Sequence, residues 1–329
     1  SMAIPPLEAL EDAETVTTDG HWYARDLLYD WDTFVENIVD PSHVPYAHHG
    51  IQGSRKKPMQ FGLKLSRSER DSGVRGDLCP QDPALVNVAE EAAKHEGSFI
   101  EFRPPFLIRY NFQSRSSFGK TKEVDTKRAA NLCIFGIPTK PGHCRVLFKF
   151  VIVNAGSLPK FARWLIARTP TWKDHQTRNK VFDSDAFLLY LQEMELAQGT
   201  KDGWKEKFFM PTSLDALVTG FRTWVDKFTN GGPYGLAGAD TGKSAGAAAA
   251  AYTKREVMDR YEQHTKHCKA CSGALRNTKI LQVAALVACV VGACLRNLPL
   301  ALTSLAAAFY AEKWKQRFIF VDHIHAHQD

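Results

Sequence analysis

The sequence lacks two patterns that would assign it to well-defined protein classes. Its formal net charge is only +6 over 329 residues, and it has no dense block of lysine and arginine, so a nucleic-acid partner is not expected. The nearest basic cluster, SRKKP at 54–58, is typical of a solvated loop. The seven cysteines are odd in number and irregularly spaced, which argues against a secreted disulfide scaffold.

Apolar residues are abundant enough for a large core, since they make up 44% of the chain and include 20 Phe and 7 Trp. Several runs have the composition of β-strands and are bounded by proline and glycine. They are a short run within WYARDLLYD (22–30), then FGLKLSR (61–67), FLIRYNFQS (106–114), AANLCIFGI (129–137) and RVLFKFVIV (145–153). Their spacing favours one antiparallel sheet over alternating βαβ units.

Two segments after these strands have helical periodicity. The second half of 158–197 places four apolar side chains on or near one face of a helix, namely Phe182, Leu188, Leu189 and Leu191. A second helix lies within 210–232, where Thr212 or Ser213 can cap it. Its core stripe comprises Phe221, Trp224 and Phe228. For residues 1–230 the sequence therefore predicts an α+β fold of the helix-grip type, an antiparallel sheet around a long helix.

The C-terminal third differs in character. A Gly/Ala-rich linker at 231–252 leads to a tail, 253–329, with apolar runs at 280–295 and 300–311. A 16-residue helix spans roughly 24 Å, against about 30 Å for the hydrocarbon core of a bilayer, so each run is short by itself. Together they predict an α-helical membrane hairpin, and a hairpin buried in protein is the alternative.

Positive charge is concentrated at the outer ends of the two apolar runs, with only Arg296 in the turn between them. The flanking residues are Lys266, Lys269, Arg276, Lys279, Lys313, Lys315 and Arg317. By the positive-inside rule, both ends of the hairpin face the compartment where the protein is made or matured.

The stretch ENIVDPSHVPYAHHG is the first candidate metal site. Asp40, His43 and His48 follow the spacing D-x2-H-x4-H, and imidazole is a good ligand for iron, copper and zinc. Histidines five residues apart on a regular helix point about 140° from each other. Pro45 interrupts such a helix, and the irregular turn can bring both rings to one ion. His49 is a rival ligand, and an ordinary polar turn is the alternative to a metal site.

A non-haem ferrous oxygenase site needs two histidines and one carboxylate on one face of the metal. The helical segment VFDSDAFLLYLQE (181–193) offers Asp183 and Asp185 as candidates for the carboxylate. Acidic residues are also common at helix starts without any metal.

Taken together, these motifs resemble the catalytic domain of Rieske-type oxygenases, and in particular the pheophorbide a oxygenase-like family of plastids. In that family the histidine motif is followed by a strand-rich domain, a D-x6-Q-E helix, a linker, a DR-[FY]-x-QHT-x2-C-x2-C segment and two membrane helices. The corresponding segment here reads DRYEQHTKHCKACSGAL (259–275). The resemblance extends from about residue 20 to the end of the chain.

The resemblance implies a mononuclear Fe(II) ion with His43, His48 and Asp185 as ligands. Asp185 stands seven residues before Gln192, as the family pattern requires, whereas Asp183 is two residues too early.

It further implies that Asp40 is the acid that bridges the iron to a neighbouring cluster, with Asn37 supporting the ligands. The implied substrate is a chlorophyll-derived tetrapyrrole or pigment. The implied place is a chloroplast membrane, thylakoid or inner envelope, with the main domain on the stromal side.

A Rieske oxygenase also needs a [2Fe-2S] cluster, bound through C-x-H and C-x2-H pairs, and no such pair occurs in this sequence. The cluster is therefore expected on a partner, such as a Rieske subunit or a reductase with ferredoxin, unless the chain is truncated. An oligomer is expected, because in the family the cluster of one subunit serves the iron of the next. The alternative function is a non-catalytic structural or pigment-binding subunit of a photosynthetic or envelope membrane complex.

Cys268 and Cys271 form a C-x2-C pair, for which the resemblance implies a redox role and thioredoxin as a partner. His264 and His267 could complete a zinc site with them, although four ligands from one short segment would be strained. Two unreactive thiols are the third possibility.

Overall fold

The computed structural model describes residues 21–57, 61–80, 97–115, 127–153, 161, 164, 168–197, 203–229, 232 and 252–324. The chain divides into two compact units, the first made of Ser1–Thr169 and Leu188–Ala251, the second of Pro170–Phe187 and Tyr252–Asp329. Helix α6 (Thr171–Ala197) contributes residues to both units. The predicted linker at 231–252 lies outside the described residues, except for 232 and 252.

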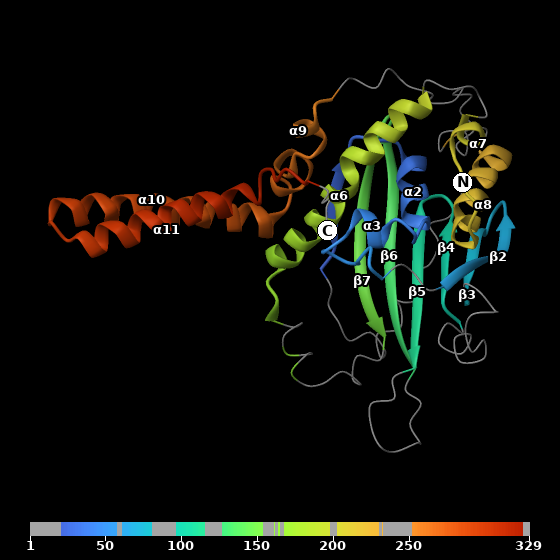
Figure 1. Ribbon diagram of the computed structural model, residues 1–329, viewed down its shortest axis with the longest axis horizontal. Helices are drawn as coiled ribbons and strands as arrows, with labels where there is room; N and C mark the ends of the chain where they lie inside the picture. Colours follow the sequence, from blue (N-terminus) through green and yellow to red (C-terminus); the bar gives the residue numbers. More distant parts are fainter. Residues whose placement is uncertain are drawn as a thin grey trace, which may run out of the picture. The chain divides into compact units, whose positions relative to one another are not determined.

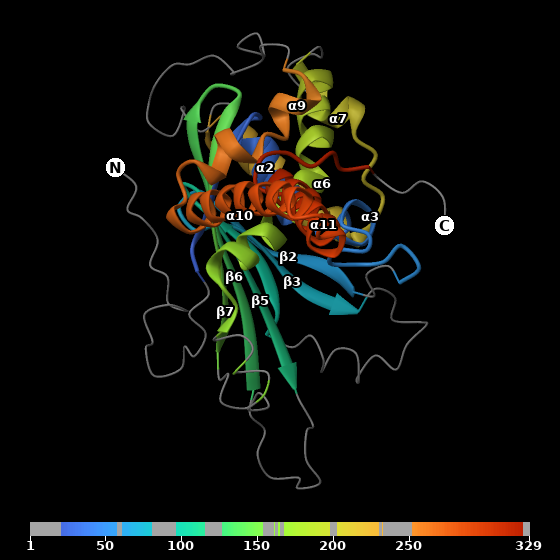
Figure 2. The ribbon, with the colours of Figure 1, turned by 90° about the vertical axis from the view of Figure 1, so that its left-hand side faces the viewer.

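The first unit is built on a seven-stranded sheet with the order β1-β7-β6-β5-β4-β3-β2, in which every neighbouring pair is antiparallel. Figures 1 and 2 show the long strands β5, β6 and β7 side by side. The strands are β1 (Tyr23–Leu27), β2 (Phe61–Glu69), β3 (Gly73–Pro80), β4 (Phe99–Arg103), β5 (Leu107–Arg115), β6 (Lys127–Lys140) and β7 (His143–Val153). The predicted α+β class is confirmed.

Strands β3 and β4 are absent from the sequence-based prediction. The first contains Gly73, Gly76 and Pro80, residue types that are depleted in strands. The second has only five residues and carries charges at Glu101 and Arg103. Their pairing with each other and with β2 and β5 on either side, rather than their own propensity, places them in the sheet.

Helices α2 (Trp31–Val39) and α8 (Ala216–Phe228) make the largest helix contacts with the sheet. Their aromatic rings form an edge-to-face cluster with a ring from β4, with centroids 5.1 to 5.7 Å apart, a favourable arrangement for buried rings. The cluster comprises Trp31, Phe102, Phe221 and Trp224, all of them buried. The predicted start of the second helix is confirmed, since Thr212 and Asp215 form a capping box ahead of α8.

A buried ion-pair network joins α2 to α8. The Arg222 guanidinium contacts Asp32 at 2.5 Å and also donates to Glu36, and all three side chains are largely shielded from solvent. The amide of Gln192, near the end of α6, donates to the other oxygen of Glu36 at 2.7 Å. Breaking such a pair would leave a buried charge uncompensated. The network therefore fixes the helix that leads into the histidine motif.

The side-chain carboxyl group of Glu193, the residue after Gln192, lies in an unusual environment. The backbone N–H of Asp30 donates to its Oε2 at 2.5 Å. Burial, with the added charges of Asp30 and Asp32, raises the pKa of Glu193 to about 8, although the hydrogen bond from Asp30 opposes the rise. At neutral pH this side chain is therefore largely protonated in the folded protein.

This raised pKa predicts a pH-dependent stability. Between pH 4.5 and about 8 the folded state holds a proton that the unfolded state has released, so stability falls as pH rises through that window. Glu193→Gln keeps a neutral acceptor for Asp30 and should remove this slope, worth on the order of 1–4 kcal/mol over the whole window. Thermal unfolding of both proteins at pH 5.5 and 8.5 measures it. Parallel pH profiles for the two would contradict the raised pKa.

The second unit consists of the start of α6 and the C-terminal helices α9 (Lys254–Val257), η4 (Tyr261–Thr265), α10 (Lys269–Cys294) and α11 (Leu298–Gln316). Its core centres on Cys271, Leu275 and Phe318, with Trp172 packed against them. A buried pair between Arg260 and Asp183 ties η4 to α6, with nitrogen–oxygen distances of 2.6 and 2.7 Å. This small unit is thus assembled from segments far apart in the sequence.

The apolar face predicted for α6 is only partly correct. Phe182 and Leu189 are buried, but Leu188 and Leu191 are 47% and 44% exposed. The buried stripe runs through Phe182, Ala186, Leu189 and Tyr190, at spacings of four, seven and eight residues. Leu188 and Leu191 fall off this stripe.

Helices α10 and α11 lie side by side (Figures 1 and 2). They approach closely near the turn, where a Cβ on Gly292 would lie 2.8 Å from the Ala301 nitrogen. Among the described residues one helix, α10, is long and apolar enough to cross a membrane. Large apolar side chains on both helices are exposed, including Ile280, Val290, Leu302 and Phe309.

Candidate metal centres

The histidine motif folds into a single helical turn with one histidine at each end. Helix α3 (Val44–Ala47) follows His43, carries Pro45 in its first turn and ends at His48. The two Nε2 atoms lie 3.3 Å apart, and the ring centroids are separated by 5.0 Å. The proline-containing turn thus brings the two rings together.

The spacing of these two nitrogens matches that of two ligands of one metal ion. Nitrogens each bound at about 2.1 Å to the same ion lie roughly 3.0–3.4 Å apart. The Nδ1 atom of His43 lies 2.5 Å from the backbone carbonyl of Asp40 and 3.7 Å from its carboxylate. Because a carbonyl can only accept, the proton of His43 sits on Nδ1, and Nε2 presents its lone pair. The same arrangement orients metal-binding histidines in general.

Asp40 and the last turn of α2 are themselves held in place. Ser42 donates to the Asp40 carboxylate through its backbone N–H and its hydroxyl, at 2.7 and 2.5 Å. Burial would raise the pKa of Asp40, but His43 and Ser42 outweigh it and hold that pKa below its usual value. The hydroxyl of Tyr110 donates to the Ile38 carbonyl, a contact that the sequence did not predict. The backbone carbonyl of Asn37, a half-buried residue on α2, accepts the Asp40 N–H at 3.3 Å.

The rival ligand His49 has another contact. Its Nδ1 accepts the backbone N–H of Arg55 at 3.2 Å. The loop that follows packs tightly on α3, because a Cβ on Gly53 would lie only 2.8 Å from the Cα of Pro45. His49 therefore stabilises the loop, and the adjacent His48 is the one whose nitrogen meets His43.

The two candidate carboxylates on α6 differ in their surroundings. Asp183 is in the buried ion pair with Arg260, at 2.6 Å, with both side chains almost fully shielded. Asp185 is buried two residues further along α6, in the second unit. The sequence contains one clue to this ion pair, because Arg260 belongs to the DRYEQHT motif. Residue spacing alone could not show that Arg260 and Asp183 meet.

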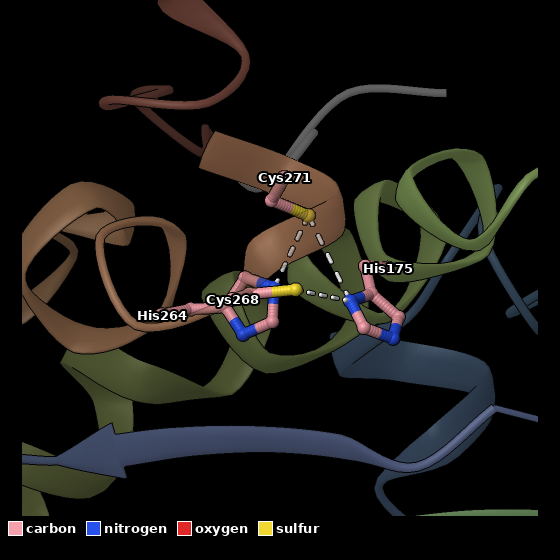
Figure 3. A group of neighbouring side chains, drawn as sticks. All are labelled: His175, His264, Cys268 and Cys271. Carbon is pink, nitrogen blue, oxygen red and sulfur yellow. Dashed lines mark hydrogen bonds between the residues drawn. The ribbon is translucent and has the colours of Figure 1, made fainter. Parts of the chain in front are cut away.

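A second group of ligand-type side chains lies within the second unit. His175, His264, Cys268 and Cys271 each offer one ligand atom, and these atoms all lie within 4.8 Å of one another. Figure 3 shows the four side chains pointing toward one another. The zinc alternative considered from sequence placed His267 in this set, but His267 is exposed and His175 takes that place. His175 lies 93 residues from Cys268, so no local spacing could have identified it.

The chain matches the family described as Pheophorbide a oxygenase over residues 102–202. It is 30% identical to the chloroplastic pheophorbide a oxygenase of Oryza sativa subsp. japonica, over 93% of this chain and 57% of that protein. It is also 30% identical to the chloroplastic flavonoid 8-hydroxylase 2 of Ocimum basilicum, over 98% of this chain and 60% of that protein.

Among solved structures, dicamba monooxygenase bound to dicamba aligns at 13% identity with a TM-score of 0.45, over 68% of this chain and 61% of that one. The chain spans less than two thirds of the length of the curated relatives given above. Taken together, the family match over residues 102–202 and the relatives along nearly the whole chain show that this chain is similar to the pheophorbide a oxygenase family.

Proposed function

We propose that this chain is the iron-binding part of a dioxygen-dependent oxygenase that acts on a chlorophyll-derived tetrapyrrole. His43 and His48 are proposed as iron ligands, with Asp185 as the carboxylate of the set. The observation that carries the proposal is the pair of Nε2 atoms 3.3 Å apart, with the proton of His43 fixed on the opposite nitrogen by Asp40. Two imidazoles and one carboxylate form the usual ligand set of non-haem Fe(II) oxygenases.

The side chains around the site have definable tasks in this proposal. Bound Fe(II) supplies the dioxygen chemistry that protein side chains lack. Asp40 orients His43 and, in a helix-grip catalytic domain of this family, links the iron to the electron source. Tyr110 anchors the turn that carries Asp40, and Asn37 lies in the same turn. Gln192 and Glu193 belong to the D-x6-Q-E motif. Gln192 donates to Glu36 of α2, and Glu193 accepts from Asp30, the residue before α2, so both act as positioning residues.

Electrons are proposed to come from a [2Fe-2S] Rieske cluster on a partner, fed by a reductase or ferredoxin, within an oligomer. Helices α10 and α11 are proposed to form a membrane hairpin. Their exposed apolar surface, the length of α10 and the basic residues at both outer ends support this. The proposed location is a thylakoid or inner-envelope membrane of the chloroplast, with the main unit on the stromal side.

Substrate turnover tests the activity directly. The full chain in its membrane, supplied with ferredoxin, ferredoxin reductase, NADPH and a Rieske-cluster partner, is expected to consume pheophorbide a only when dioxygen is present. A parallel reaction with a flavonoid tests the substrate class suggested by the basil relative. Consumption of the flavonoid alone would replace the tetrapyrrole with that class.

The alternative role, a structural or pigment-binding membrane subunit, makes a different prediction. Such a protein would consume neither compound and would contain no iron. Binding of pheophorbide a without turnover, in a preparation free of iron, would support that role and contradict the oxygenase.

A further inference from the structure

Two histidines and two cysteines from three separate segments converge in the second unit (Figure 3). His175 lies in the first turns of α6, His264 in η4, and the cysteines flank the start of α10. We propose that these four side chains bind one Zn²⁺ ion in a closed, structural site.

The interatomic distances fit a single tetrahedral ion. The Nδ1 atom of His175 lies 3.4 Å from the Cys268 sulfur and 3.7 Å from the Cys271 sulfur. The Nε2 atom of His264 lies 3.3 Å from the Cys271 sulfur. With zinc–sulfur bonds of about 2.3 Å and zinc–nitrogen bonds of about 2.05 Å, a tetrahedral site has sulfur–nitrogen edges of about 3.6 Å. The three sulfur–nitrogen distances given above lie on both sides of that value.

The donor set and its burial select a structural zinc site. Two thiolates and two imidazoles in tetrahedral geometry are typical of zinc. His175, His264 and Cys271 are at most 3% exposed, and Cys268 is half-buried, so four protein ligands leave no open position for substrate.

The same donor types bind a Rieske cluster, but the geometry here differs. In a Rieske centre both cysteines bind one iron and both histidines bind the other, with sulfides between them. His175 here lies within 3.7 Å of both sulfurs, and all four ligand atoms fall within 4.8 Å of one another. That separation leaves no room for two bridged irons, whereas it suits one ion.

The redox pair implied by the family resemblance would need only the two cysteines. One imidazole is enough to activate the attacking thiol of such a pair, whereas here two imidazoles, from segments 89 residues apart in sequence, point at the sulfurs. A zinc ion uses all four groups. It would also hold η4 and the base of α10 to α6, beside the Arg260–Asp183 pair that joins the same segments. Structural zinc sites contribute directly to folding free energy.

Metal analysis of the full chain, purified without chelators, tests the proposal. About one zinc per chain is expected. It should persist in His267→Ala, since His267 is exposed and outside the cluster, and be lost in His175→Ala and Cys268→Ser. The thiols should resist alkylation until a chelator is added. Zinc retained in His175→Ala would overturn the four-ligand site.

A second measurement keeps the test decisive if the ligand variants fail to fold. Wild-type protein expressed with Co²⁺ should show the visible absorption of a tetrahedral, thiolate-bound ion. Metal-free protein with a Cys268–Cys271 disulfide that thioredoxin reduces would overturn the zinc site in favour of the redox pair. His43→Ala should retain zinc, which separates this inference from the proposed iron site.

Discussion

Replacing His43 with alanine is expected to lower the affinity for Fe(II) by more than a hundredfold and to reduce turnover below detection. Loss of a residue that only supports a metal ligand typically costs 10–100-fold in metal affinity, so loss of a ligand should cost more. The Nε2 atom of His43 is one of two nitrogens that converge 3.3 Å apart, and alanine removes it. Anaerobic titration with Fe(II), followed by the turnover assay with pheophorbide a, measures both effects.

The adjacent histidine supplies a matched control. His49 is half-buried in the same turn and accepts a backbone hydrogen bond from Arg55 at 3.2 Å. Its replacement with alanine should cost some loop stability but leave Fe(II) affinity within a fewfold of wild type. If His49→Ala and His43→Ala reduce Fe(II) affinity equally, the assignment of the ligands is incorrect.

The second large effect is expected from Asp183→Asn. This change leaves the Arg260 guanidinium buried without the carboxylate that neutralises it, at a side-chain exposure of only 2%. Removing one partner of a buried pair typically costs about 3–5 kcal/mol. We therefore expect the apparent unfolding temperature to fall by roughly 10 °C, as measured by a thermal scan of the detergent-solubilised chain.

An exposed ion pair in the same unit provides the comparison. Lys254 and Asp322 lie 2.6 Å apart, but their side chains are 40% and 52% exposed. Asp322→Asn should cost less than about 1 kcal/mol. Equal effects of the two substitutions would mean that burial of the Asp183 pair is not what stabilises this unit.

Because Asp183 is paired with Arg260, folded Asp183→Asn should also keep its iron, whereas Asp185→Ala should lose it.

Much of the sheet could be predicted from the sequence because long runs such as RVLFKFVIV have both high strand propensity and clear boundaries. The turn at His43 and His48 was predictable for a local reason: five residues and one proline determine it. The missed strands β3 and β4 illustrate the limit. Glycine, proline and charge lower their own propensity, and their neighbours in the sheet supply the hydrogen bonds.

Contacts between distant segments were the part that the sequence could not supply. His175 meets Cys268 across 93 residues, and Arg260 meets Asp183 across 77. Neither pair has a spacing that a local motif could detect. The zinc alternative drawn from the sequence therefore includes His267, whereas the ring nitrogen that meets the sulfurs belongs to His175. Tyr110 was missed similarly, since its bond to the Ile38 carbonyl spans 72 residues.

The most direct test of the iron site is the iron content of the wild-type chain, purified anaerobically from its own membrane. The His43–His48 arrangement predicts about one Fe(II) per chain, retained in His49→Ala and absent from the His43→Ala/His48→Ala double variant. A wild-type protein without iron, or a double variant that keeps it, would contradict an iron site at these two histidines.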